Sequence, residues 1–163
     1  MSDLKAKYIR FAGVVALVVA LDQLTKALVL KKLPLFKSVA VIPGFFSLTH
    51  VNNPGGAFGF LAQNGSVWRH WVFLAAAMVA LSMILYFYHR TPKNYPFLEL
   101  GLSLIFGGAI GNLIDRLRFG EVVDFLDFYI GHFHWPTFNV ADSAVTIGVG
   151  IFILHIIFKK MPF

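Results

Sequence analysis

The sequence contains no cysteine and few charged residues. None of its 163 residues is a cysteine, which excludes disulfide bonds, thiolate catalysis and cysteine-ligated zinc. Only 13% of the residues are charged, whereas soluble domains carry about 25%. Hydrophobic residues make up 58% of the chain, and the mean hydropathy is +0.72. This composition is typical of an integral membrane protein and excludes an ordinary soluble enzyme.

The charge that is present is mostly basic and is dispersed along the chain. The formal net charge is +6, yet the lysines and arginines stand at the ends of apolar runs rather than in one stripe. That distribution suits the headgroups of membrane lipids better than a nucleic-acid backbone. We therefore expect membrane lipids, and no nucleic acid, among its partners.

Four apolar runs are long enough to cross a membrane, because a spanning helix needs about 20 mostly apolar residues. We expect a single all-α membrane domain, residues 1–163, with four transmembrane helices. The expected helices cover residues 11–30, 71–88, 97–114 and 140–158. The longer loops, residues 31–70 and 115–139, then lie on one side and both termini on the other. Seven basic residues at the termini and the short link, against six in the long loops, favour cytoplasmic termini.

The first long loop carries strand signals. The stretch "VAVIPGFFSLTHVN", residues 39–52, has short runs of β-branched and aromatic residues that are broken by Pro43 and Gly44. We expect these residues to form a small β-cradle at the extracytoplasmic surface of the membrane.

Polar residues inside or beside membrane helices are costly there, so they are functional candidates. Asp22 and Lys26 are four residues apart and can pair on one face of the first helix. A pair that only orients the helix is the favoured explanation, and a functional role is the alternative. Asn112, Asp115 and Arg116 share a face at the end of the third helix. They fit either a capping ion cluster or a cation presented to a substrate.

Carboxylates accumulate after the third helix. Asp124 and Asp127 lie among valine and phenylalanine, an environment that raises the pKa of a carboxyl group. Asp142, with Asn139, begins the fourth helix, where capping of free N–H groups is an equal explanation. Because the third helix runs outward and the fourth inward, Asp142 returns to the level of the other acids. Two facing carboxylates that share a proton can activate water, as in aspartyl proteases. Spacing leaves open whether Asp115, Asp124 or Asp127 is the partner.

Other functions compete with a protease. His132 and His134 face the same way in an extended chain, but this pair is a weak zinc signal, and we expect no metal or cofactor. A small proton-coupled transporter can use the same carboxylates, although acids gathered at one face do not form a path across the membrane. A non-catalytic scaffold has no need of aspartates in apolar surroundings.

Five motifs occur together in an informative order. These motifs are "DQLTK", "NNPGGAFGF", "GGAIGNLIDR", "VVDF" and "FNVADS". In order and approximate spacing they resemble the bacterial lipoprotein signal peptidases (signal peptidase II), over nearly the whole chain. The resemblance implies an intramembrane aspartyl endopeptidase of the bacterial cytoplasmic membrane that is inhibited by the cyclic peptide globomycin. Its expected substrates are prolipoproteins whose cysteine at the cleavage site carries a diacylglyceryl group.

The resemblance also implies roles for individual residues. The aspartates of "VVDF" and "FNVADS" match the family's catalytic pair, Asp124 and Asp142. Matches to the family's substrate-positioning groups are Asn53, Asn112, Arg116 and Asn139, and matches to further supporting positions are Asp22, Lys26 and Asp115. In one departure, Pro54 and Gly56 stand where the family more often has threonine and alanine, which changes the flexibility expected of the cradle.

Overall fold

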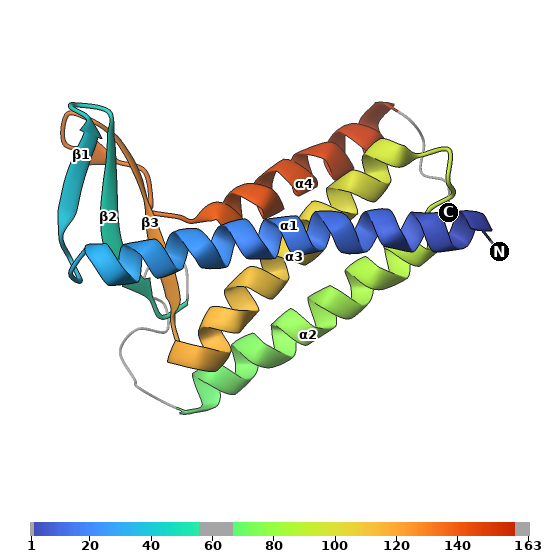
Figure 1. Ribbon diagram of the computed structural model, residues 1–163, viewed down its shortest axis with the longest axis horizontal. Helices are drawn as coiled ribbons and strands as arrows, with labels where there is room; N and C mark the ends of the chain where they lie inside the picture. Colours follow the sequence, from blue (N-terminus) through green and yellow to red (C-terminus); the bar gives the residue numbers. More distant parts are fainter. Residues whose placement is uncertain (1, 56–66, 159–163) are drawn as a thin grey trace.

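The computed structural model describes residues 2–55 and 67–158, which form four long helices and one small antiparallel sheet (Figure 1). The helices are α1 Ser2–Lys32, α2 Val67–Arg90, α3 Pro96–Phe119 and α4 Val140–Phe158. The strands are β1 Ser38–Ile42, β2 Phe46–Asn53, β3 Val122–Ile130 and β4 Phe133–His134. The sheet projects from one end of the helical body, and the start of α1 and the end of α4 lie at the other end (Figure 1).

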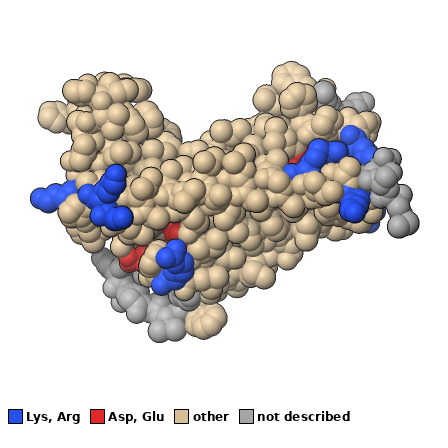
Figure 2. Space-filling view, viewed as in Figure 1, with Lys and Arg blue, Asp and Glu red and all other residues tan. Residues whose placement is uncertain are grey.

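The surface of the helical body is apolar. In the described part of the chain, four helices are long and apolar enough to cross a membrane. Leucines and other large apolar side chains point outward along them, and Leu17 and Leu24 are 60% and 63% exposed. In Figure 2, lysine and arginine side chains gather at the two ends of the visible face, with few charges between. Because exposed apolar surface of this extent is unfavourable in water, the chain is a multi-pass membrane protein, as predicted.

Helix α3 is the centre of the body and packs against the other three helices. Glycines allow this close approach. A Cβ atom on Gly107 would lie 2.9 Å from the Cβ of Val18 on α1. A Cβ atom on Gly148 of α4 would lie 2.7 Å from Cγ1 of Ile105 on α3. Small residues of this kind let membrane helices approach until their backbones are nearly in contact.

The sheet has the strand order β1-β2-β3-β4, and neighbouring strands are antiparallel. Strands β1 and β2 come from the first long loop, as predicted, with Gly44 between them at a φ of 81°. Strands β3 and β4 come from the second long loop and were not predicted, so the sheet is larger than expected. Strand β3 forms by pairing with β2, and this pairing places Asp124 opposite Val51. Gly56 lies outside the described residues.

Helix α3 continues past the expected boundary at residue 114 and ends at Phe119, where Gly120 adopts a left-handed φ of 77°. Asp115 and Arg116 therefore belong to the helix rather than to the loop. This extension carries their side chains towards the sheet, because β3 begins only three residues after the helix ends.

Gly148→Ala is expected to destabilise the protein, because the added Cβ would lie 2.7 Å from Ile105 Cγ1 and 3.1 Å from the backbone nitrogen of Ile105. Overpacking of this kind costs about 1–3 kcal/mol. Gly150→Ala on the same helix is the matched control, because no heavy atom lies within 4 Å of its added Cβ. Thermal unfolding in detergent measures both variants. Equal melting temperatures for the two variants would contradict the close contact between α3 and α4.

Candidate active site

Two carboxylates from different elements approach each other where the helices meet the sheet. Asp124 lies near the start of β3, and Asp142 lies in the first turn of α4. The side chain of Asp124 is buried, with 2% of the residue exposed, and Asp142 is half-buried. The antiparallel course of α3 and α4 therefore returns Asp142 to the level of Asp124, as the sequence suggested.

Asn139 connects the two aspartates. Its side-chain Nδ2 donates to Asp124 Oδ1 at 2.7 Å. Its Oδ1 accepts from the backbone N–H of Asp142 at 2.9 Å, and its own backbone N–H donates to Asp142 Oδ2 at 3.2 Å. The last two bonds form a capping box, because Asn139 precedes α4 and Asp142 is the third residue of the helix. Asp142 thus caps its helix with one oxygen, and its other oxygen is left for a further partner.

Two further asparagines complete the hydrogen bonding of the carboxylates. Asn112 Nδ2 donates to Asp142 Oδ1 at 2.7 Å, and Asn53 Nδ2 donates to Asp124 Oδ2 at 2.9 Å. Asn112 also accepts from Asn139 Nδ2 at 3.1 Å. Each of the four carboxylate oxygens therefore accepts a hydrogen bond from an N–H group. This network holds both acids in fixed orientations without neutralising them.

Burial raises the pKa of Asp124 from 3.8 to about 6. Loss of water around the charged form is the largest cause, and the negative charge of Asp142 raises the pKa further. Hydrogen bonds from Asn53 and Asn139 act in the opposite direction, because they stabilise the carboxylate. Asp124 therefore titrates close to neutral pH, as expected for a carboxyl group that exchanges protons in a reaction.

Arg116 brings a positive charge to the same place. It lies near the end of α3, is half-buried, and its guanidinium carbon is 5.3 Å from the centroid of the Phe73 ring on α2. Its charge interacts with those of Asp142 and Asp124. Because arginine remains protonated in proteins, the group is a permanent cation beside the two acids.

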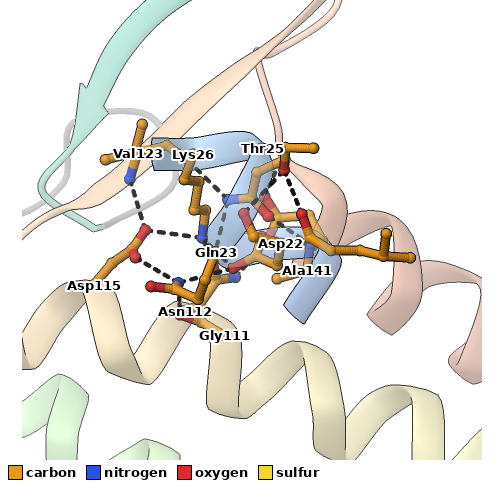
Figure 3. Close-up of polar contacts among 12 residues, drawn as sticks. Asp22, Gln23, Thr25, Lys26, Gly111, Asn112, Asp115, Val123 and Ala141 are labelled. Carbon is orange, nitrogen blue, oxygen red and sulfur yellow. Dashed lines mark hydrogen bonds and ion pairs between the residues drawn. The ribbon is translucent and has the colours of Figure 1, made fainter. Parts of the chain in front are cut away.

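A buried ion cluster contacts the side chain of Asn112 (Figure 3). Lys26 Nζ is 2.8 Å from Asp22 Oδ2 and 2.8 Å from Asp115 Oδ2, and it donates to Asn112 Oδ1 at 3.0 Å. The pairing expected between Asp22 and Lys26 is present, and Asp115 joins it from α3. Gln23 was not identified from the sequence, although its Nε2 donates to Asp115 Oδ1 at 2.9 Å. An amide next to Asp22 in an apolar helix was the available signal.

Asp127 belongs to a different group of side chains. Thr49 Oγ1 donates to Asp127 Oδ2 at 3.1 Å, and His134 Nδ1 lies 2.8 Å from Asp127 Oδ1. Residues three apart on a strand point to opposite faces of the sheet, so Asp127 and Asp124 are separated. In residues 2–55 and 67–158, no three histidine, aspartate or glutamate side chains gather in a metal-binding arrangement.

The three aspartates that spacing left open as partners of Asp142 are thus distinguished by geometry. Asp115 is held in the ion cluster, and Asp127 faces the other side of the sheet. Asp124 shares Asn139 with Asp142. The arrangement can support acid and base chemistry by two carboxyl groups, of which one is buried.

Known proteins resemble this chain over most of its length. The family model described as signal peptidase (SPase) II matches residues 14–158. A lipoprotein signal peptidase of Desulforapulum autotrophicum is 54% identical over 154 residues, which cover 94% of this chain and 95% of the relative. One from Oleidesulfovibrio alaskensis is 50% identical, with 83% of this chain and 86% of the relative covered.

A solved structure has the same fold. It is titled a bacterial membrane enzyme structure determined by the in meso method at 1.9 Å resolution, and it superposes with a TM-score of 0.81. The two sequences are 35% identical, and the match covers 93% of this chain and 94% of the other. Family model, relatives and fold agree, and the chain belongs to the signal peptidase II family of membrane peptidases.

Proposed function

We propose that this protein is an aspartic endopeptidase with Asp124 and Asp142 as its catalytic dyad. It removes the signal peptide of prolipoproteins by cleaving before a cysteine that carries a diacylglyceryl group. The observation that carries the proposal is the bonding of Asn139 to both aspartates. Membership of a peptidase family and relatives named lipoprotein signal peptidase support the reaction and the substrate class.

The dyad begins the reaction with one shared proton. Asp124 holds it, because burial raises the pKa of this carboxyl group to about 6. Asp142, at the positive end of the α4 dipole, is the ionised partner. Asp142 takes a proton from a water molecule, and the oxygen of that water attacks the scissile carbonyl carbon. Asp124 donates its proton to the carbonyl oxygen, which gives a neutral tetrahedral diol.

Breakdown of the diol restores the dyad. The proton held by Asp142 passes to the amide nitrogen, and the bond between carbon and nitrogen breaks. One hydroxyl of the diol returns its proton to Asp124 as the new carboxyl group forms. The products are the signal peptide and a lipoprotein with a free amino group at its lipidated cysteine. No cofactor takes part in these steps.

The other polar residues orient the reacting groups. Asn53, Asn112 and Asn139 hold the carboxylates by their amide groups. Arg116 presents its cation to the backbone carbonyl groups or the ester lipid head of the substrate. The cluster of Asp22, Lys26 and Asp115 holds Asn112 through the hydrogen bond from Lys26 Nζ.

The position of the site suits a lipidated substrate. Asp142 lies in the first turn of a membrane-spanning helix, so the dyad is near one edge of the hydrocarbon layer. Water reaches that depth, and the diacylglyceryl chains of the substrate can remain among membrane lipids. We assign the protein to the bacterial cytoplasmic membrane, with cytoplasmic termini and the dyad near the extracytoplasmic face.

Asp124→Asn and Asp142→Asn are each expected to lower kcat for a diacylglyceryl-modified prolipoprotein peptide by about 100-fold or more, because each removes a proton-transfer group. The assay uses the full chain in detergent micelles. Asp127→Asn is the matched control: it lies on the same strand as Asp124, but faces Thr49 and His134. Its kcat is expected to stay within a few-fold of the wild type.

Normal cleavage by Asp142→Asn would contradict the proposed dyad, as would a loss in Asp127→Asn equal to that in Asp124→Asn. Inhibition of the wild-type cleavage by globomycin is the expected accompanying result. If globomycin has no effect on the measured activity, the activity is not that of this family.

Asp124→Asn is also expected to remove a pH-dependent penalty on folding. The pKa of Asp124 rises from 3.8 to about 6 on burial, so the folded protein binds this proton more tightly than the unfolded chain. The stabilisation of the fold by this proton is complete below pH 3.8 and is lost as the pH rises through about 6, where burying the ionised carboxylate becomes a cost. The difference is worth at most about 3 kcal/mol.

Melting temperatures of the wild type and Asp124→Asn, measured in detergent at about pH 5 and about pH 8, test this penalty. The wild type should lose stability relative to the variant as the pH rises. The replacement also disturbs the bonds to Asn53 and Asn139, but that cost does not change with pH, so only the change in the difference is informative. A constant difference between the two proteins would show that the proton on Asp124 is not bound more tightly in the folded state.

A further inference from the structure

Lys26 lies between two carboxylates that come from different helices (Figure 3). Its Nζ is 2.8 Å from Asp22 on α1 and 2.8 Å from Asp115 on α3, and the three residues are at most 2% exposed. Removing such charges from water is costly, and apolar residues often give equal or greater stability at such positions. Stability alone is therefore a poor explanation for this cluster.

Each carboxylate of the cluster also accepts a backbone hydrogen bond. Asp22 Oδ1 accepts from the N–H of Ala141 at 3.0 Å, and Asp115 Oδ2 accepts from the N–H of Val123 at 3.1 Å. Ala141 immediately precedes Asp142, and Val123 immediately precedes Asp124. One lysine is thus connected, through two carboxylates, to the backbone beside each aspartate of the dyad.

We propose that Lys26 is a positioning residue that sets the separation and orientation of Asp124 and Asp142. It acts on the start of α4 through Asp22, and on the start of β3 through Asp115. The inference rests on the proposed function, because it assigns a role within the reaction of that dyad.

A third contact of Lys26 controls an amide of the site. Lys26 Nζ donates to Asn112 Oδ1 at 3.0 Å. Because an ammonium group can only donate, the oxygen of the amide must face Lys26. The nitrogen of the same amide then faces Asp142, where it donates to Oδ1 at 2.7 Å. Lys26, together with Asn139, which donates to the same oxygen at 3.1 Å, therefore determines which end of Asn112 is offered to the dyad.

The surroundings of the cluster fit this positioning role. A Cβ atom on Gly111 would lie 2.7 Å from Asp22 Oδ2 and 3.2 Å from the Cβ of Ala141. The absence of a side chain at Gly111 lets Asp22 pass across α3 to reach α4. Gln23 Nε2 donates to Asp22 Oδ2 at 3.1 Å and to Asp115 Oδ1 at 2.9 Å, and so joins the two carboxylates directly.

A competing explanation is that the cluster only holds α1 against α3. The chain offers a control for this, because Arg10 on α1 and Glu99 on α3 form another ion pair between the same helices, at 3.1 Å. Glu99 lies in the first turn of α3, roughly 24 Å along the helix from Asp115 at about 1.5 Å per residue. Glu99→Gln weakens the contact between the helices at the end remote from the dyad.

The experiment measures cleavage of the diacylglyceryl-modified peptide by the full chain in detergent, together with melting temperatures. Lys26→Arg keeps the charge but changes the length and shape of the donor. We expect its kcat to fall about 10- to 100-fold, with KM nearly unchanged, because misplaced catalytic groups lose rate rather than binding. Gly111→Ala should give the same pattern, because its Cβ displaces Asp22. Glu99→Gln should lower the melting temperature and leave kcat unchanged.

The pH dependence separates the effect of the Lys26 charge from the effect of its geometry, because a loss of kcat without a change in the pH profile is due to misplacement of the groups. The charge of Lys26 lowers the pKa of Asp124. In Lys26→Met, the pH at which kcat/KM falls through loss of the shared proton should therefore shift upward. In Lys26→Arg, which keeps the charge, it should not shift. Lys26→Met leaves two buried carboxylates without a cation, and if it does not fold, Lys26→Arg and Gly111→Ala decide the question.

A wild-type kcat in both Lys26→Arg and Gly111→Ala would overturn the positioning role. The role would also be overturned if Glu99→Gln and Lys26→Arg lost equal amounts of melting temperature and Glu99→Gln lost as much kcat as Lys26→Arg. Failure of the proposed function has a different signature, since either the wild type would then not cleave the peptide or Asp124→Asn and Asp142→Asn would both cleave normally. Inactive dyad variants combined with a fully active Lys26→Arg would leave the dyad in place and reject only the role of Lys26.

Discussion

Polar groups that are buried between membrane helices must bond to one another, because the surrounding hydrocarbon offers them no partner. The polar network of this protein meets that constraint at one end of the helical body. Asn112 and Asn139 connect the ion cluster of α1 and α3 to the two aspartates. The result is one continuous set of hydrogen bonds that runs from α1 through α3 to the sheet and to α4.

This network depends on the close approach of three helices. Gly111 leaves room for the side chain of Asp22, and Gly107 and Gly148 bring α1 and α4 against α3. Larger residues at these points would move the donors and acceptors apart by more than a hydrogen bond tolerates. Apolar packing and polar bonding are therefore parts of one arrangement, in which the glycines set the distances that the polar side chains require.

The helices were predictable from the sequence, and most of the sheet was not. Runs of about 20 apolar residues need no tertiary context to be recognised, whereas β3 exists because β2 lies beside it. The omission had a consequence for the site. Had the segment from Val122 to Ile130 been identified as a strand, the spacing of three between Asp124 and Asp127 would have placed them on opposite faces.

The local role of Asp142 was predictable, because the start of an apolar helix is recognisable and a carboxylate at this position can form a capping box. The contacts of Asp22 with Ala141 and of Asp115 with Val123 were not predictable. They join segments that only the packing of α1, α3 and α4 brings together. The missed role of Gln23 has the same cause. Its amide joins Asp22 on its own helix to Asp115 on α3, and only the packing of the two helices brings Asp115 within reach.

The unequal burial of Asp124 and Asp142 gives the proposed dyad a direction. In the proposed mechanism, the buried Asp124 donates a hydrogen bond to the reacting group, and Asp142 at the helix N-terminus accepts one. A single hydroxyl group placed between them can satisfy both, because its oxygen accepts from Asp124 and its hydrogen is donated to Asp142. Compounds that mimic the diol with a secondary alcohol can thus accept a hydrogen bond from one aspartate and donate one to the other through a single oxygen atom.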